Sequence, residues 1–180
     1  MSASTNDTDK TIPTNRVQMT HLLLSLLHTK SYVYGGFVRD CIVLGLVSFN
    51  DVDLFLVETP SEFEEKLQPF FLVHKKQCKL ESVSFVIACK MNVELTLSLD
   101  VVFGEINDVP DFDVNMLRYC HGRVELRKEN LNLDLEQVIQ HVRNQQFQIL
   151  NMEQTYYLKR RVKKMMKKGW VCINPIEWKI

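Results

Sequence analysis

The chain has 180 residues, of which 46% are apolar and 24% are charged, as in ordinary soluble globular proteins. Its five cysteines form no CxxC pair, it begins with no signal-peptide pattern, and no apolar run approaches the ~20 residues that span a bilayer. A disulfide framework, a zinc site and a membrane span are therefore disfavoured. We expect an intracellular, cytoplasmic protein with no membrane partner.

A net charge of zero hides a difference between the two ends of the chain. From His141 onward there are nine basic and two acidic residues, a net charge of +7, and residues 1–140 carry −7. A basic C-terminal segment beside an acidic body is typical of proteins with a polyanion partner.

The pattern of apolar and turn-forming residues predicts three parts: a disordered tail over 1–13, a folded domain over 14–150, and a basic helix and tail over 151–180. Helices are expected from a cap at Thr14, and over 37–46, 60–67, 111–119 (capped by Asp111), 135–142 and 156–168. Strands are expected over 32–34, 52–57, 70–74, 83–89 and 93–103, and a loop over 107–110. This order predicts an α+β fold with a mixed β-sheet and a helical C-terminal tail.

An Asp-Val-Asp, residues 51–53, stands at the start of the strand expected at 52–57. Asp51 and Asp53 would point to one face, with Cα atoms roughly 6.5–7 Å apart, and could bind one divalent cation or two. Asp100 interrupts the apolar run "ELTLSLDVVF", where a charge is costly unless it is paired or metal-bound. On adjacent strands the three carboxylates would form a catalytic site for Mg²⁺ or Mn²⁺. Two alternatives stay open: a solvated strand end for the pair, and an edge-strand charge for Asp100.

Two glycines, Gly35 and Gly36, precede the segment "FVRD". Glycines let a backbone approach a ligand closely, and the helix that they open offers free N–H groups to an anion. A divalent metal beside a phosphate-binding turn favours phosphoryl or nucleotidyl transfer. The alternative is a simple turn, with Arg39 and Asp40 forming a local surface ion pair.

The segments "GGFVRD", "DVDLFLV" and "DFDVNMLRY" together resemble the head domain of class II tRNA nucleotidyltransferases (CCA-adding) and bacterial poly(A) polymerases, in the DNA polymerase β-like superfamily. The resemblance covers about residues 30–125. It implies a polymerase β-like nucleotidyltransferase fold, an NTP substrate, and Mg²⁺ or Mn²⁺. By resemblance, Gly35 and Gly36 shape the triphosphate turn, Arg39 and Asp40 support the nucleotide site, Asp51 and Asp53 bind the metals, and Asp111 and Asn115 lie near the sugar and phosphates.

The chain departs from that family in three ways. Val109 and Pro110 stand where the family has two arginines, which removes two charge-assisted contacts to a triphosphate. The linker from the glycines to Asp51 is about two residues longer, and no Glu-Asp-x-x-Arg motif follows residue 125. We therefore expect a minimal head domain without neck, body and tail domains. It would transfer NMP to a hydroxyl of RNA, protein or a small molecule, or else be an inactive module that binds nucleotide or RNA.

The segment "YYLKRRVKKMMKKGW" predicts an amphipathic basic helix. Its apolar stripe would consist of Leu158, Val162, Met165 and Met166. The basic side chains that we expect to contact nucleic acid are Arg160, Lys163, Lys164 and Lys167. A docking helix with a solvated basic face is the alternative, and calmodulin-like or membrane-surface binding is a weaker one.

Overall fold

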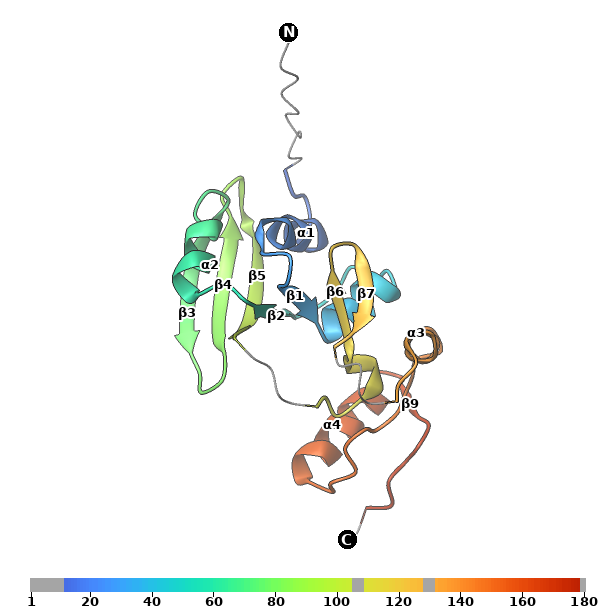
Figure 1. Cartoon of the computed structure of the whole chain (residues 1–180). Helices are drawn as coiled ribbons and strands as arrows, with labels where there is room; N and C mark the ends of the chain where they lie inside the picture. The colour runs from blue at the N-terminus through green and yellow to red at the C-terminus, as the bar shows by residue number, and fades with distance from the viewer. Residues whose placement is uncertain (1–11, 105–108, 128–131, 179–180) are drawn as a thin grey trace.

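A mixed seven-stranded sheet organises the molecule (Figure 1). The structure is a computed structural model and describes residues 12–104, 109–127 and 132–178. The strand order is β3-β4-β5-β2-β1-β6-β7, in which β2 and β5 are parallel and every other neighbouring pair is antiparallel. The strands are β1 (Tyr32–Tyr34), β2 (Asp51–Leu56), β3 (Phe71–Cys78), β4 (Val83–Cys89), β5 (Asn92–Phe103), β6 (Leu117–Cys120) and β7 (Arg123–Leu126). The predicted α+β class with a mixed sheet is confirmed.

The α-helices begin at polar residues whose side chains accept a backbone N–H of the first turn. They are α1 (Arg16–Leu26), α2 (Pro60–Leu67), α3 (Leu135–Arg143) and α4 (Tyr156–Lys167), capped by Asn15, Thr59, Asp134 and Thr155. The predicted cap at Thr14 is thus wrong by one residue. Within the described ranges, no helix is long and apolar enough to cross a membrane. Most of the predicted tail 1–13 and the first half of the predicted loop 107–110 lie outside the described residues.

The two faces of the central strands differ in polarity, as the alternation of side chains along a strand requires. One face is apolar and buried in the core, where Phe63 of α2 packs edge-to-face against Phe85 of β4, with ring centroids 5.5 Å apart. The other members of this face include Val52, Leu54, Leu56, Ile87, Leu97, Leu99 and Val101. The opposite face of β2 and β5 presents Asp51, Asp53, Ser98 and Asp100, so polar groups lie at the centre of the sheet.

The helix predicted over 111–119 is wrong. The segment forms a 3-10 turn, η2 (Asp113–Asn115), and then β6, which pairs with β7 in a hairpin that we did not predict. Asp113 is fully buried, and its carboxylate accepts the backbone N–H groups of Val114 and Gln148, which holds the chain away from a helical path. His121 and Gly122 between the strands both have positive φ, as a tight hairpin turn needs.

The helix predicted over 37–46 is a shorter π-helical turn, η1 (Val38–Val43). The strand predicted over 70–74 begins at Phe71 and extends further, to Cys78, because β4 pairs with it that far, across a register shift between Val73 and Lys75. A further two-stranded ladder, β8 (Gln146–Phe147) with β9 (Val171–Cys172), ties the C-terminal segment to the region after α3.

The helix α4 lies at the lower end of the molecule in Figure 1 and packs into the main core. Leu158, Val162 and Met165 are buried, as the predicted stripe requires. Met166 is 56% exposed, so its place in that stripe is wrong. The division into units 14–150 and 151–180 stays a prediction.

Candidate active site

Three carboxylates share one face of two adjacent strands. Asp53 of β2 is the register partner of Asp100 of β5, and Asp51 is the partner of Ser98. Side chains of register partners point to the same face, and so do those two residues apart along a strand. The structure therefore brings Asp51, Asp53 and Asp100 to the open face of the sheet, at its centre.

Asp53 lies in an unfavourable place for a negative charge. Its pKa is raised to about 7, from an ordinary 3.8, by burial first and then by the charges of Asp51 and Asp100, against the lowering effect of Arg127 and Arg161. A divalent cation between the carboxylates would relieve this repulsion. The electrostatics of the pair Asp51 and Asp53 thus fit a hard metal ion.

Asp100 is turned toward the neighbouring hairpin. One of its oxygens accepts hydrogen bonds from Ser82 at 2.9 Å and Ser84 at 3.2 Å, and Lys79 forms an ion pair with it at 3.2 Å. Within 12–104, 109–127 and 132–178, no group of three His, Cys, Asp or Glu side chains is arranged to hold a metal ion. Asp51 and Asp53 stay predicted metal ligands, and Mg²⁺ commonly uses one or two carboxylates together with substrate phosphates.

The glycine turn between β1 and η1 lies against Asp53. Gly35 has φ of +71°, and a Cβ atom built on it would lie 3.0 Å from Oδ2 of Asp53. A Cβ on Gly36 would lie 3.7 Å from a guanidinium nitrogen of Arg39. Only a residue without a side chain fits at Gly35, both for the backbone angle and for the close approach of Asp53.

Arg39, Asp40 and Asn115 form one network beside the glycine turn. The guanidinium of Arg39 pairs with both carboxylate oxygens of Asp40, at 2.6 and 2.7 Å, and donates to the amide oxygen of Asn115 at 3.1 Å. Arg39 is only 5% exposed, and its guanidinium lies 5.0 Å from the ring centre of Trp170. Arg39 is thus held between Asp40, Asn115 and Trp170.

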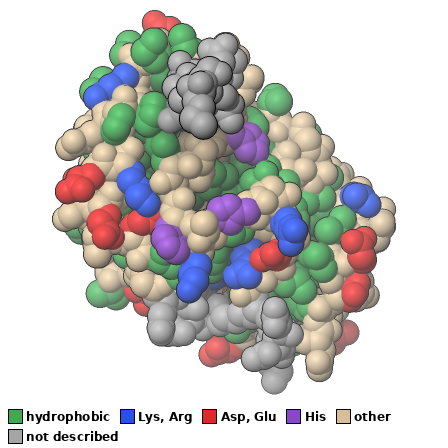
Figure 2. Space-filling model, turned by 45° about the horizontal axis from the view of Figure 1, so that its top comes forward, with side chains coloured by type: hydrophobic (Ala, Val, Ile, Leu, Met, Phe, Trp, Pro, Cys, Tyr) green, Lys and Arg blue, Asp and Glu red, His purple; other side chains and the backbone are tan. Residues whose placement is uncertain are grey.

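These groups line one cavity of about 930 Å³. The acidic wall comes from η1, β2 and β5, and the basic wall comes chiefly from α4. Its charged lining residues are Asp40, Asp51, Asp53 and Asp100, and Arg39, Arg127, Arg160, Arg161, Lys164 and Lys168. On the face shown in Figure 2, by contrast, acidic and basic side chains are interspersed among apolar ones. The walls of the cavity thus differ in charge, one acidic and the other chiefly basic.

The structure divides the residues expected to contact nucleic acid. Arg160 and Lys164 line the cavity that holds Asp53, whereas Lys163 and Lys167 are exposed and are not among its lining residues. Asp111, expected near the sugar, does not line it either and forms an ion pair with Arg161 at 3.0 Å.

The lining residues missed from the sequence include Arg127, Tyr157 and Arg161. Arg127 lies on the segment after β7, with its guanidinium 4.4 Å from the ring centre of Tyr34. None of the three belongs to a motif, because their place in the site depends on how β7 and α4 dock. The charge of the C-terminal segment was the one available signal for Arg161.

Comparisons with known proteins identify the fold of the chain. Neither a protein-family model nor a curated protein matches the sequence. Among solved structures, the Thermotoga maritima CCA-adding enzyme complexed with tRNA matches with a TM-score of 0.59 and 18% identity, over 87% of this chain and 40% of that one. The chain has the nucleotidyltransferase-like fold of the CCA-adding enzymes.

Two further CCA-adding enzyme structures agree. One, in complex with ATP, has a TM-score of 0.56 and 17% identity, over 85% of this chain and 38% of that one. The other, with CTP, has a TM-score of 0.51 and 19% identity, over 74% of this chain and 34% of that one. The chain thus spans roughly two fifths or less of the length of these CCA-adding enzymes, and at these identities the likeness concerns the fold alone.

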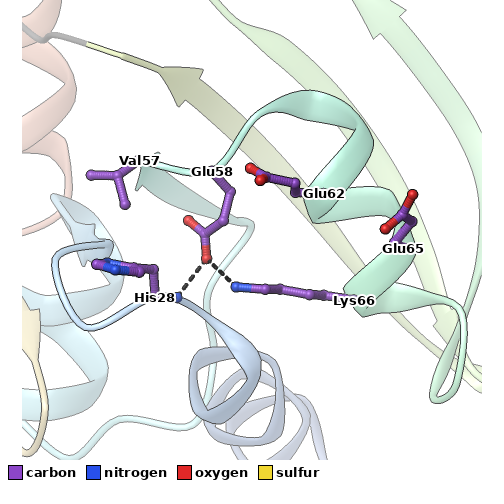
Figure 3. A pocket seen from close by; sticks show the side chains of 6 residues that line it. All are labelled: His28, Val57, Glu58, Glu62, Glu65 and Lys66. Carbon is purple, nitrogen blue, oxygen red and sulfur yellow. Dashed lines mark hydrogen bonds and ion pairs between the residues drawn. The ribbon is translucent and has the colours of Figure 1, made fainter.

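A separate cavity of about 510 Å³ lies between α2 and the loop after α1. Figure 3 shows the Glu58 carboxylate between the backbone of His28 and the ammonium of Lys66. Burial would raise the pKa of Glu58, but hydrogen bonds from Ser31, Lys66 and His28 lower it to about 2. This buried carboxylate joins two parts of the core, and we assign it to stability.

Proposed function

We propose that the protein is a metal-dependent nucleotidyltransferase that moves a nucleoside monophosphate from an NTP to an acceptor hydroxyl, with an RNA 3′ end as the favoured acceptor. The observation that carries this proposal is the opposition of two walls in one cavity, with Asp51 and Asp53 facing arginines and lysines of α4. A space of about 930 Å³ is of the size that small-molecule ligands occupy.

Different residues of the cavity would bind the metal ion and the phosphates. Asp51 and Asp53 would hold Mg²⁺ or Mn²⁺, which when bound lowers the pKa of an attacking hydroxyl and offsets charge on the phosphates. The Gly35 turn packs against Asp53 and lines the same cavity, where its backbone can approach the phosphates. Arg127 and Arg161 supply the cationic contacts that a triphosphate needs and that Val109 and Pro110 cannot make.

The transfer step follows from this arrangement. The acceptor oxygen attacks the α-phosphorus and forms a P–O bond, while the bond from that phosphorus to the oxygen bridging to the β-phosphate breaks. Pyrophosphate leaves with the electron pair, and its charge is offset by Arg161 and Lys164. The hydroxyl proton passes to Asp100, which lies beside Asp53 on the neighbouring strand.

The test is incubation with each labelled NTP, Mg²⁺ or Mn²⁺, and a mixture of small RNAs. We expect RNA products lengthened by one or more nucleotides, and no product in excess EDTA. Tight, metal-dependent NTP binding without any product would instead identify the second candidate, an inactive nucleotide-binding module. The ion pair between Lys79 and Asp100 favours that candidate, because it engages the third carboxylate.

The outward side of α4 completes the proposal. Lys163 and Lys167 are exposed, and we propose that they contact backbone phosphates of an RNA upstream of its 3′ end. Arg160 and Lys164 are assigned to the nucleotide, because they line the cavity.

A further inference from the structure

A second groove, of about 240 Å³, lies beside the nucleotide cavity on the open face of β3, β4 and β5. Asp51 and Asp100 line both spaces, so the two meet at the carboxylates. We propose that this groove binds the 3′-terminal nucleotides of a single-stranded RNA acceptor and delivers its hydroxyl to Asp100. This inference rests on the proposed function, which leaves open where the acceptor lies.

Strand register builds the groove. One row of register partners runs across four strands, from Gln77 of β3 through Ser84 of β4 and Asp100 of β5 to Asp53 of β2. A second row runs from Lys75 through Val86 and Ser98 to Asp51. Because register partners share a face, polar groups of β3 and β4 extend the carboxylate face sideways.

Lys76 shows the contrast on the same strand. It is paired with buried Phe85, lies with its ammonium 5.8 Å from the centre of that ring, and forms an ion pair with Glu64 of α2. Its neighbours Lys75 and Gln77 line the groove instead. Lys75 and Lys76 are adjacent in the sequence, and they therefore lie on opposite faces of the sheet.

The side from which the acceptor arrives follows from the geometry of phosphoryl transfer. The attacking and leaving oxygens lie roughly in line on opposite sides of the phosphorus. Arg161 and Lys164, which offset the charge of the leaving pyrophosphate, come from α4, so pyrophosphate departs toward that helix. The acceptor must then approach from the other side of the carboxylates, which is the side of β3, β4 and β5.

The chemistry of the lining suits a nucleic-acid end. Lys75 and Lys79 offer ammonium groups to phosphates, and Gln77, Ser84 and Ser98 offer hydrogen bonds to ribose hydroxyls. In the free protein Lys79 pairs with Asp100, with side chains 47% and 35% exposed. Such a half-exposed pair contributes little stability, so a phosphate can take Lys79 and leave Asp100 for the hydroxyl proton.

The test uses an RNA trinucleotide with a free 3′ hydroxyl, which presents a 3′ end with few phosphates beyond it. We compare K75Q, the double variant K75Q/K79Q, and the matched control K76Q. The double variant should bind the trinucleotide at least tenfold more weakly, with a salt slope shallower by about 1.4, from about 0.7 per lost phosphate contact. K75Q should show about half of that change in slope, and it leaves the partner of Asp100 in place. K76Q should bind as the wild type does, and NTP affinity should be equal in all four proteins.

A cross-linking experiment locates the end directly. A trinucleotide with 4-thiouridine at its 3′ terminus should cross-link to peptides of β3, β4 or β5. Cross-links confined to α4, or equal trinucleotide affinities for K75Q/K79Q and K76Q, would overturn the groove. Neither measurement needs turnover. If the variants bind the trinucleotide as predicted but no nucleotide transfer occurs, the proposed function is wrong and the assignment of the groove stands. If transfer occurs but the variants bind the trinucleotide as the wild type does, the assignment of the groove is wrong and the proposed function stands.

Discussion

The guanidinium of Arg39 donates a hydrogen bond to the side-chain oxygen of Asn115, 3.1 Å away, and so joins segments 76 residues apart. Replacing Arg39 with Lys keeps the charge but loses the planar fork that also holds Asp40. We expect Arg39→Lys to lower the free energy of unfolding by roughly 1–3 kcal/mol in urea denaturation. The exposed Arg123 offers a control, and Arg123→Lys should change little. Equal losses would show that the network is unimportant.

Gly35 and Gly45 provide a matched pair for the glycine turn. Both have positive φ, +71° and +68°, but only at Gly35 would a Cβ atom meet Asp53, since nothing lies within 4 Å of it at Gly45. Both alanine variants should lose roughly 1–2 kcal/mol of stability through backbone strain. Only Gly35→Ala should also weaken metal-dependent NTP binding, measured by calorimetry. Equal NTP affinity in the two variants would mean that Asp53 tolerates displacement.

Asp53→Asn separates catalysis from folding. Turnover should fall at least a hundredfold, about 2.7 kcal/mol or more of lost transition-state stabilisation. The stability of the metal-free protein should instead increase. The folded pKa of Asp53 is about 7 and its ordinary value is 3.8, so the metal-free protein loses stability as pH rises through that window. In EDTA, the melting temperature of the variant should exceed that of the wild type at pH 8, and the gap should close by pH 4. Unchanged turnover would rule out the mechanism.

Glu58→Gln tests the buried carboxylate of Figure 3. The folded pKa of Glu58 is about 2 against an ordinary 4.5, so its stabilisation is complete above pH 4.5 and is lost as pH falls toward 2. The variant should be less stable by about 1–3 kcal/mol at pH 7, and the deficit should shrink below pH 4.5. Glu65 lines the same cavity but is exposed, and Glu65→Gln should be neutral. A deficit independent of pH would show that charge is not its cause.

The basic residues of α4 should separate into two functional pairs. Changing Lys163 and Lys167 to Gln should flatten the salt slope of RNA binding by about 1.4 and leave NTP affinity unaltered. Changing Arg160 and Lys164 to Gln should reduce NTP affinity at least tenfold, because they line the nucleotide cavity. Salt titrations with RNA and calorimetry with NTP measure both effects. If the first pair leaves the slope unchanged, that side of α4 is only solvated surface.

Local patterns predicted the parts of the fold that local forces determine. The helix α2 has a capping box between Thr59 and Glu62 and an N-terminal proline, and its bounds agree with the expected 60–67. The strand alternation around Asp53 and the lone charge of Asp100 in an apolar run sufficed to place both on strands, and the register then paired them. A carboxylate within an apolar strand is costly unless it is paired or bound to a metal, so few other arrangements of Asp53 and Asp100 were favourable.

The features that were not predicted depend on contacts between residues that are distant in the sequence. The helix expected over 111–119 is absent because buried Asp113 is bound by the backbone of Gln148, 35 residues later, and by His141 of α3 at 2.5 Å. The cavity contributions of Arg127 and Arg161 likewise depend on docking. A single sequence carries such information only weakly, since tertiary contacts override local preference.

The parallel pairing of β2 with β5 also bears on how the protein folds. The chain between these strands passes through α2, β3 and β4, so the pair closes over a long stretch of sequence and forms slowly compared with the hairpins. Until it closes, Asp53 and Asp100 are far apart, and the proposed nucleotide site is not formed. A metal–NTP complex would therefore recognise only molecules that have finished folding, and at saturating concentration it would draw the chain toward that state by mass action.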